Sequence, residues 1–196
     1  MQSPSKLNSN GSALFLDASA VINLVASNRM EEILSALACP ILIEETVCRE
    51  FKRNPRDGRS SKGVIEALAA RSRLTVIKMS DTQFEIFLQL TGSPPPDDLG
   101  DGEAATLACA DGAGAAIIDE KKAMRIAARD FSTMSIYSSL DLICSEMVSS
   151  RLGKSGVSDA VYEALKVARM RVPHHWRNWI REVLGRERAT ELAFLK

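Results

Sequence analysis

Short apolar runs that alternate with helix-like segments constrain the fold of this chain more than any other feature of its sequence. The spacing of the apolar positions predicts buried strands in the short runs and amphipathic helices between them. Strands that alternate with helices form a parallel sheet covered by helices on both faces. We therefore expect an α/β fold. The runs predicted as strands lie at residues 13–16, 41–43, 74–79, 114–119 and 132–136.

The two ends of the chain depart from this alternation. Residues 1–12 are polar and lack the apolar stretch of a secretion signal, so we expect a disordered lead-in. Residues 13–150 contain the alternating part, whereas residues 151–196 have only helical patterns. We expect this last range to form a helical C-terminal extension, which is either a small subdomain or an arm that docks a partner.

Charge is unevenly distributed, although the whole chain is neutral. The extension carries ten Lys and Arg against five Asp and Glu, so the preceding part is acidic by the same margin. An acidic body with a basic tail suits a metal site in one part and a polyanion or an acidic partner in the other. Ordinary solvated helix faces would give the same counts.

The sequence predicts neither a membrane span nor a disulfide framework. No apolar run approaches the roughly 18 residues of a membrane span. The four cysteines are scattered without a CxxC pair, which favours buried thiols in a reducing compartment over a zinc site. We therefore expect a cytoplasmic protein without a membrane partner.

Two of the predicted strands end in an acidic residue. Asp17 follows the first strand, and Asp119 closes the fourth. Ligands of open α/β sheets bind at the carboxyl ends of the strands, so both acids lie at the usual binding edge. Glu103 near the start of a helix and Glu50 after the second strand can reach the same edge. Each acid alone is better explained as a helix cap, and only their convergence favours a site.

Four converging carboxylates need a neutralising partner. Two like charges about 4 Å apart repel by roughly 4 kcal/mol at an effective dielectric constant near 20, whereas a helix cap contributes about 1 kcal/mol. Such a cluster persists when some carboxylates are protonated or when a divalent cation neutralises them. Oxygen ligands without His or Cys select a hard ion, Mg²⁺ or Mn²⁺. Such a site suits phosphodiester hydrolysis, because the ion lowers the pKa of a bound water and stabilises charge on the phosphate.

Four segments carry a resemblance to a known family. In chain order they are LFLDASAVINL, ILIEETVCREF, DLGDGEAATLACA and AAIIDEKKAMRIAARDF. Each motif is weak alone, but the ordered set resembles the four acidic motifs of PIN-domain endoribonucleases, and most closely the VapC-like toxin branch. The resemblance covers residues 13–150. It implies a Rossmann-like sheet, an acidic pocket for Mg²⁺ or Mn²⁺, cleavage of RNA, a homodimer and a cognate antitoxin.

The resemblance also implies roles for individual residues. Asp17, Glu103 and Asp119 would bind the metal, and Glu50 would orient the attacking water or hold a second ion. Ser19 matches the small polar partner of the first acid. Further acids stay open as alternatives, namely Glu44 or Glu45 in place of Glu50, Asp101 beside Glu103, and Glu120 beside Asp119.

Cations near these acids are candidates for binding the RNA backbone. For those on a predicted helix, solvated surface positions are the more ordinary explanation. The candidates are Lys52, Arg53, Arg56 and Arg59 in the loop after the second motif, and Lys121 and Arg125 on the helix after the fourth.

Aromatic residues in the extension have two explanations. Trp176 and Trp179 share a helical stripe with Ile180, which favours a core or dimer contact over base stacking. The adjacent His174 and His175 point to different sides of any regular element and make a poor metal pair.

Two other functions compete with a nuclease. The same fold could serve as a binding or regulatory module that acts through its basic helical tail. A phosphatase with Asp17 as a covalent nucleophile would need a second acid two positions on, where this chain has Ser19.

Overall fold

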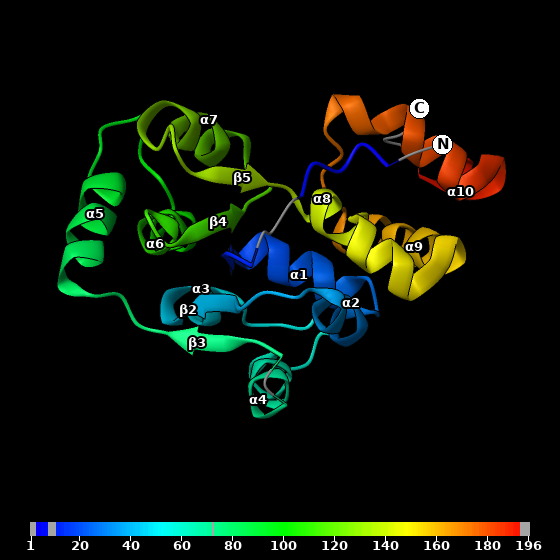
Figure 1. Cartoon of the computed structure of the whole chain (residues 1–196), viewed down its shortest axis with the longest axis horizontal. Helices are drawn as coiled ribbons and strands as arrows, with labels where there is room; N and C mark the ends of the chain where they lie inside the picture. The colour runs from blue at the N-terminus through cyan, green and yellow to red at the C-terminus, as the bar shows by residue number, and fades with distance from the viewer. Residues whose placement is uncertain (1–2, 8–10, 72, 193–196) are drawn as a thin grey trace.

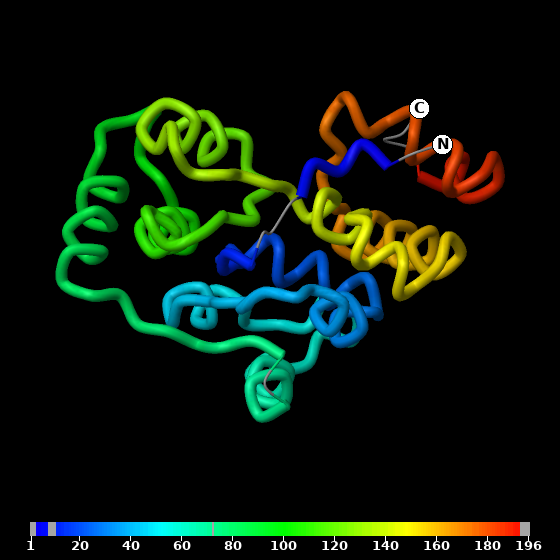
Figure 2. The backbone as a smooth tube through the Cα atoms, in the orientation of Figure 1, coloured from blue at the N-terminus to red at the C-terminus, as the bar shows by residue number. Residues whose placement is uncertain are grey.

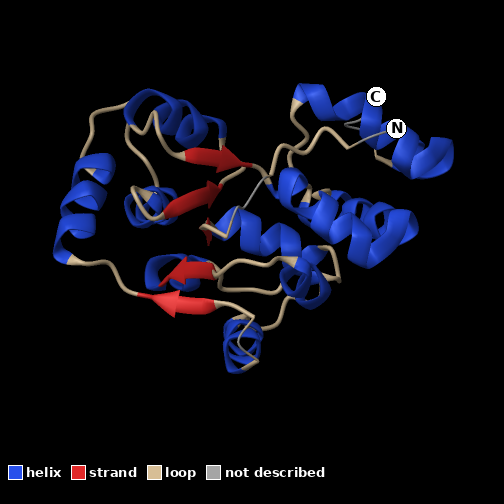
Figure 3. Ribbon diagram, viewed as in Figure 1, coloured by secondary structure: helices blue, strands red, loops and turns tan. Residues whose placement is uncertain are grey.

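Five parallel strands form the centre of the protein in the computed structural model, which describes residues 3–7, 11–71 and 73–192. The strand order is β3-β2-β1-β4-β5, and Leu14 pairs with Ile41 on one side and Ala115 on the other. Figure 3 shows the strands surrounded by helices, which confirms the predicted α/β fold. The strands are β1 (Ala13–Leu16), β2 (Ile41–Glu44), β3 (Thr75–Ile77), β4 (Gly114–Ile117) and β5 (Ser135–Tyr137).

Helices cover both faces of this sheet (Figure 1). Along β1, Leu14 and Leu16 enter one hydrophobic cluster and Phe15 enters the other, because successive strand side chains point to opposite faces. The helices are α1 (Ala18–Ala26), α2 (Met30–Ala36), α3 (Glu45–Glu50), α4 (Lys62–Ala70), α5 (Asp81–Thr91), α6 (Asp101–Ala110), α7 (Lys121–Asp130), α8 (Ser139–Ile143), α9 (Glu146–Ala168), the 3-10 turn η1 (His174–Trp176) and α10 (Arg177–Glu191).

The basic extension is built into the main hydrophobic core. The predicted boundary at residue 150 falls inside α9, which breaks at Gly153, where φ is +68°. Val157 and Ile180 belong to the same buried cluster as the β1 side chains, and α9 packs on α1 and α2. Trp176 is fully buried, so the predicted stripe of Trp176, Trp179 and Ile180 contributes to the hydrophobic core. The described part of the extension therefore packs against the sheet domain and does not form an arm.

Part of the predicted lead-in also contacts the domain. The Ser5 hydroxyl donates to the main-chain oxygen of Asp141 at 2.6 Å, and Leu7 packs against the main core. Residues 1, 2 and 8–10 of the predicted lead-in lie outside the described residues.

Side chains cap the first helix and the longest one. Asp17 caps α1, because its carboxylate accepts from the Ala20 N–H, while Ser19 hydrogen-bonds to that carboxylate. Ser145 caps α9, whose second part begins after the break at Gly153. In the part of the chain that the structure describes, no helix combines the length and apolarity needed to cross a bilayer.

Replacing Trp176 tests whether the extension and the sheet share one core. We expect Trp176→Ala to lower the free energy of unfolding of the whole chain by about 3–5 kcal/mol, because it empties a fully buried site. Trp176→Phe should cost less, since the Trp176 Nε1–H has no hydrogen-bond partner to lose. Urea unfolding followed by circular dichroism measures both. Leu88→Ala, at a side chain 51% exposed, is the control. An unchanged main transition in Trp176→Ala would show that the extension folds separately.

Candidate active site

Two acids lie buried at the carboxyl ends of the central strands. Asp17 directly follows β1 and is 2% exposed, and Asp119 follows β4 and is 6% exposed. The Asp17 N–H donates to the Ile117 oxygen at 3.2 Å, which ties the ends of the two neighbouring strands together. The strand order thus brings both predicted acids to one edge of the sheet.

Asp17 is held by neutral donors. Its carboxylate accepts from the Ala20 N–H at 2.6 Å and from the Ser19 hydroxyl at 2.9 Å. Burial raises the pKa of Asp17 well above its ordinary value, and the charges of Asp119 and Glu103 raise it further. Asp17 is therefore both the cap of α1 and a member of an acidic cluster.

Asp119 is surrounded by donors from distant parts of the chain. Asn23 Nδ2 donates to its carboxylate at 2.7 Å, and Ser139 donates both its N–H, at 2.9 Å, and its hydroxyl. Arg171 Nη1 donates to the main-chain oxygen of Asp119 at 2.5 Å. Burial raises the pKa of Asp119, while the bonds from Ser139 and Asn23 oppose that shift.

Sequence reasoning missed these three partners of Asp119. Asn23 had one available signal, since it is a polar residue within the apolar helix stretch AVINLVA. Ser139 resembled an ordinary residue at a helix start, and Arg171 an ordinary tail cation.

The other two predicted acids meet at the start of α6. Glu103 accepts from the Gly100 N–H at 2.9 Å, and Glu50 of α3 accepts from the Gly102 N–H at 2.9 Å. A Cβ at Gly102 would overlap the Glu50 carboxylate, so a larger residue would force this carboxylate to move away. The positive end of the helix dipole favours both charges. Burial raises the pKa of Glu103, against the bond from Gly100, and the charges of Glu50 and Glu120 add to the rise.

The acids considered as alternative site residues make other contacts or are exposed. Glu44 is buried and caps α3 through a 2.5 Å bond from the Thr46 N–H, and Glu45 pairs with Lys78 at 3.5 Å. Asp101 is exposed at the first position of α6. Glu120 is exposed and caps α7. Glu50 is thus the acid of this segment that contacts α6.

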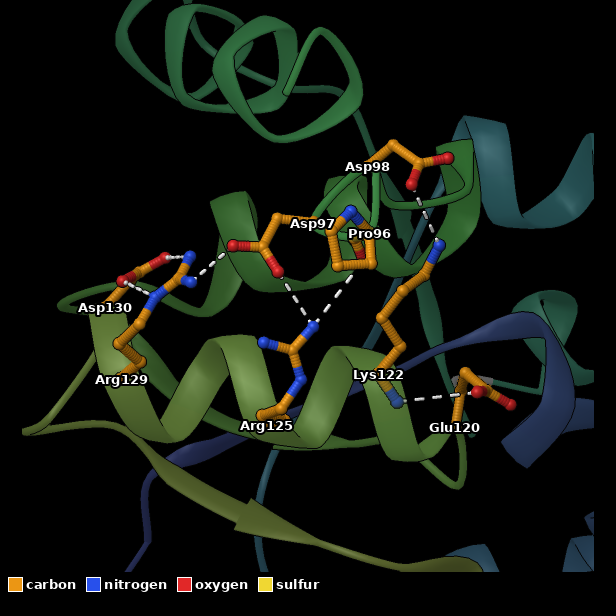
Figure 4. Close-up of polar contacts among 8 residues, drawn as sticks. All are labelled: Pro96, Asp97, Asp98, Glu120, Lys122, Arg125, Arg129 and Asp130. Atoms are coloured by element: carbon orange, nitrogen blue, oxygen red, sulfur yellow. Dashed lines mark hydrogen bonds and ion pairs between the residues drawn. The ribbon is translucent and has the colours of Figure 1, made fainter. Parts of the chain in front are cut away.

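Acids in the loop before α6 bind cations of α7 (Figure 4). Arg125 pairs with Asp97 at 2.8 Å, Arg129 pairs with the same carboxylate, and Lys122 pairs with Asp98 at 3.4 Å. Hydrogen bonds from the two arginines hold the pKa of Asp97 below its usual value. Arg125, predicted to bind RNA, therefore has a partner within the protein.

The remaining predicted RNA-binding cations lie on the surface. Lys121 is exposed at the start of α7, and Lys52 and Arg53 are exposed after α3. Arg56 of the same loop pairs with Glu163 of α9 at 2.8 Å, which ties the loop to the extension.

The acids of this site provide the oxygen ligands of a hard metal ion, but they are not gathered closely enough to coordinate one. Within residues 3–7, 11–71 and 73–192, no three His, Cys, Asp or Glu side chains stand together in a group that could hold a metal ion. The cluster nevertheless offers only carboxylate oxygens, and the charges of Asp119 and Glu103 contribute to the raised pKa of Asp17. Oxygen donors of this kind fit Mg²⁺ or Mn²⁺.

A parallel α/β sheet with buried acids at its carboxyl edge places this protein among the α/β domains that bind ligands at that edge. The family model DUF3368, described as a PIN domain, matches residues 13–174, so the chain belongs to this PIN-domain family. PIN domains are generally nucleases. The match extends past the predicted boundary at residue 150 and takes in α9. No curated protein and no solved structure matches the chain.

Gly102 tests the contact between α3 and α6. An alanine inside a helix is normally about 1 kcal/mol more favourable than glycine. We expect Gly102→Ala to lack this gain, because its Cβ displaces the Glu50 carboxylate and breaks the hydrogen bond from the Gly102 N–H. In a Glu50→Ala background, which has no such bond to lose, Gly102→Ala should show the gain. Urea unfolding measures both variants. The matched control is Gly63→Ala in α4, where a Cβ meets open space. Equal effects at Gly102 and Gly63 would contradict the model of the site.

The pH dependence of stability tests the burial of Asp17. A carboxyl group whose pKa is raised in the folded state binds its proton more tightly there, so stability falls as pH rises above about 4, the unfolded value. We expect Asp17→Asn, measured with a chelator, to be more stable than the unsubstituted protein at pH 7. The difference should shrink as pH falls toward 4. Chemical unfolding at several pH values measures this, and a difference independent of pH would refute it.

Proposed function

We propose that this protein is a Mg²⁺- or Mn²⁺-dependent endoribonuclease that hydrolyses RNA phosphodiester bonds. The observation that carries this proposal is the burial of Asp17 beside Asp119 and Glu103, with only neutral donors on its carboxylate. Like charges buried together are costly unless a cation neutralises them. A hard divalent ion is the neutralising group that oxygen ligands select.

Each residue of the site has a role in this proposal. Asp17, Glu103 and Asp119 would hold the ion, and Glu103 would exchange its bond from the Gly100 N–H to do so. When bound, the ion would supply an activated water and charge stabilisation on the phosphate. Glu50 would orient the water that attacks phosphorus as the P–O bond breaks and the leaving oxygen takes a proton. Ser19 would fix Asp17.

Asn23 and Ser139 act as positioning residues in the same proposal. Their three hydrogen bonds fix both oxygens of the Asp119 carboxylate and favour its ionised form. A metal ligand held in this way needs little rearrangement when the ion arrives.

We also propose that the protein is the toxin of a type II toxin–antitoxin pair, with a cognate antitoxin and a homodimeric, cytoplasmic form. The ordered motifs that resemble the VapC-like branch support this assignment. Phe84 and Leu88, one turn apart on α5, expose 47% and 51% of their surface and could contact such a partner.

One observation favours a second candidate, a PIN-fold binding or regulatory module without catalysis. Glu50 and Glu103 both bind N–H groups of α6, and within the described residues no group of three acids is assembled for a metal. Such a module would act through its basic helical tail, and it would bind RNA or a partner without cleaving it.

Replacing Asp17 separates the two candidates. We expect Asp17→Asn to reduce cleavage of labelled tRNA and mRNA more than about a hundredfold, because metal charge stabilisation contributes several kcal/mol. The protein alone should cleave with Mg²⁺ or Mn²⁺ and not with chelator. Asp98→Asn, at a half-exposed carboxylate paired with Lys122, makes the same chemical change as a control. An unchanged cleavage rate in Asp17→Asn would reject the nuclease mechanism.

A further inference from the structure

A pocket of about 710 Å³ lies between the end of α9 and both ends of α10. Its lining includes apolar side chains, those of Leu165, Met170, Val172 and Leu192. Among the described residues, its charged lining consists of four cations and one acid, namely Lys166, Arg169, Arg171, Arg177 and Glu191. In a chain with no net charge, this is a local excess of positive charge.

The single acid of this pocket is already neutralised. Glu191 accepts from the Tyr162 hydroxyl at 2.5 Å and from Lys166 Nζ at 3.5 Å. Among the described residues, neither Arg169 nor Arg177 is paired with a carboxylate. Two guanidinium groups are therefore available to a ligand.

The two arginines lie at the ends of the segment that joins α9 to α10. Arg169 takes a left-handed conformation, with φ of +54°, where α9 ends and the chain turns. Arg177 begins α10 directly after η1, and its N–H donates to the His174 oxygen. The positive charge of the pocket therefore comes from its side chains.

The pocket adjoins the acidic cluster through Arg171. This residue lines the pocket, and its Nη1 donates to the main-chain oxygen of Asp119 at 2.5 Å. Figure 2 shows the chain leaving α9 and passing the junction of β5 and α8 before it enters α10. A polyanion that crosses the acidic site can thus continue into a basic pocket.

We propose that this pocket binds a backbone phosphate of single-stranded RNA, beside the phosphate at the acidic cluster. This proposal rests on the proposed nuclease function, which places the scissile phosphate of the RNA strand at the acidic cluster. Paired guanidinium forks match phosphate oxygens. The lining residues within the described part of the chain include no aromatic ring for base stacking, so we expect these residues to contact the phosphate and not the bases.

RNA binding by a cleavage-deficient chain tests this proposal. The parent is full-length Asp17→Asn, and the probe is a fluorescent single-stranded RNA of about 12 nucleotides, followed by anisotropy. We expect Arg169→Gln with Arg177→Gln to weaken binding about tenfold at low salt. The slope of log affinity against log salt should fall by about 1.4, or about 0.7 for each lost phosphate contact.

The matched control removes two exposed cations elsewhere. Arg73→Gln with Lys154→Gln changes residues before β3 and on the far half of α9. Circular dichroism verifies the fold of every variant. Equal affinities of the pocket variant and this control variant would overturn the proposal. The absence of RNA binding by the parent would overturn it as well.

A polyglutamate peptide is the second probe, because an acidic protein segment is the other polyanion that suits the pocket. Loss of peptide binding in the pocket variant, with RNA binding unchanged, would overturn the proposal in favour of a protein partner. The binding assay is independent of cleavage. Pocket-dependent RNA binding by a protein that never cleaves RNA would refute the nuclease function and support this pocket.

Discussion

Burial of like-charged carboxylates at the ends of β1 and β4 is the constraint on which the rest of the structure depends. Asp17 and Asp119 follow neighbouring strands, and the charge of Asp119 adds to the cost of ionising Asp17. The surrounding helices supply neutral donors, with Ser19 and Asn23 on α1 and Ser139 on α8. These hydrogen bonds offset part of the cost of burying the two carboxylates.

The start of α6 supplies hydrogen-bond donors for the other two acids. N–H groups that would otherwise need a cap donate to the carboxylates of Glu50 and Glu103. Glycine at positions 100 and 102 leaves room for these carboxylates, because a Cβ at either position would displace a carboxylate oxygen. In the proposed function, Glu103 would have to release the Gly100 N–H in order to bind the ion.

The extension links the acidic edge to a basic surface. Helices α9 and α10 share the main core with the sheet, and Arg171 donates to the main-chain oxygen of Asp119. The basic pocket thereby adjoins the acidic edge. In the function that we propose, an RNA strand would extend between them, with its flanking phosphates at the guanidinium groups and its scissile phosphate at the acids.

The sequence by itself determined the periodicities and the acids. Alternating apolar runs specify strands and helices locally, and an acid that ends a parallel strand must face the binding edge, so Asp17 and Asp119 were found. Only the tertiary structure decided the partners of Asp119, because Asn23 and Arg171 lie 96 and 52 positions away from it. No local pattern encodes such contacts. They arise when the strand order places β4 beside β1 and the extension closes over the same core.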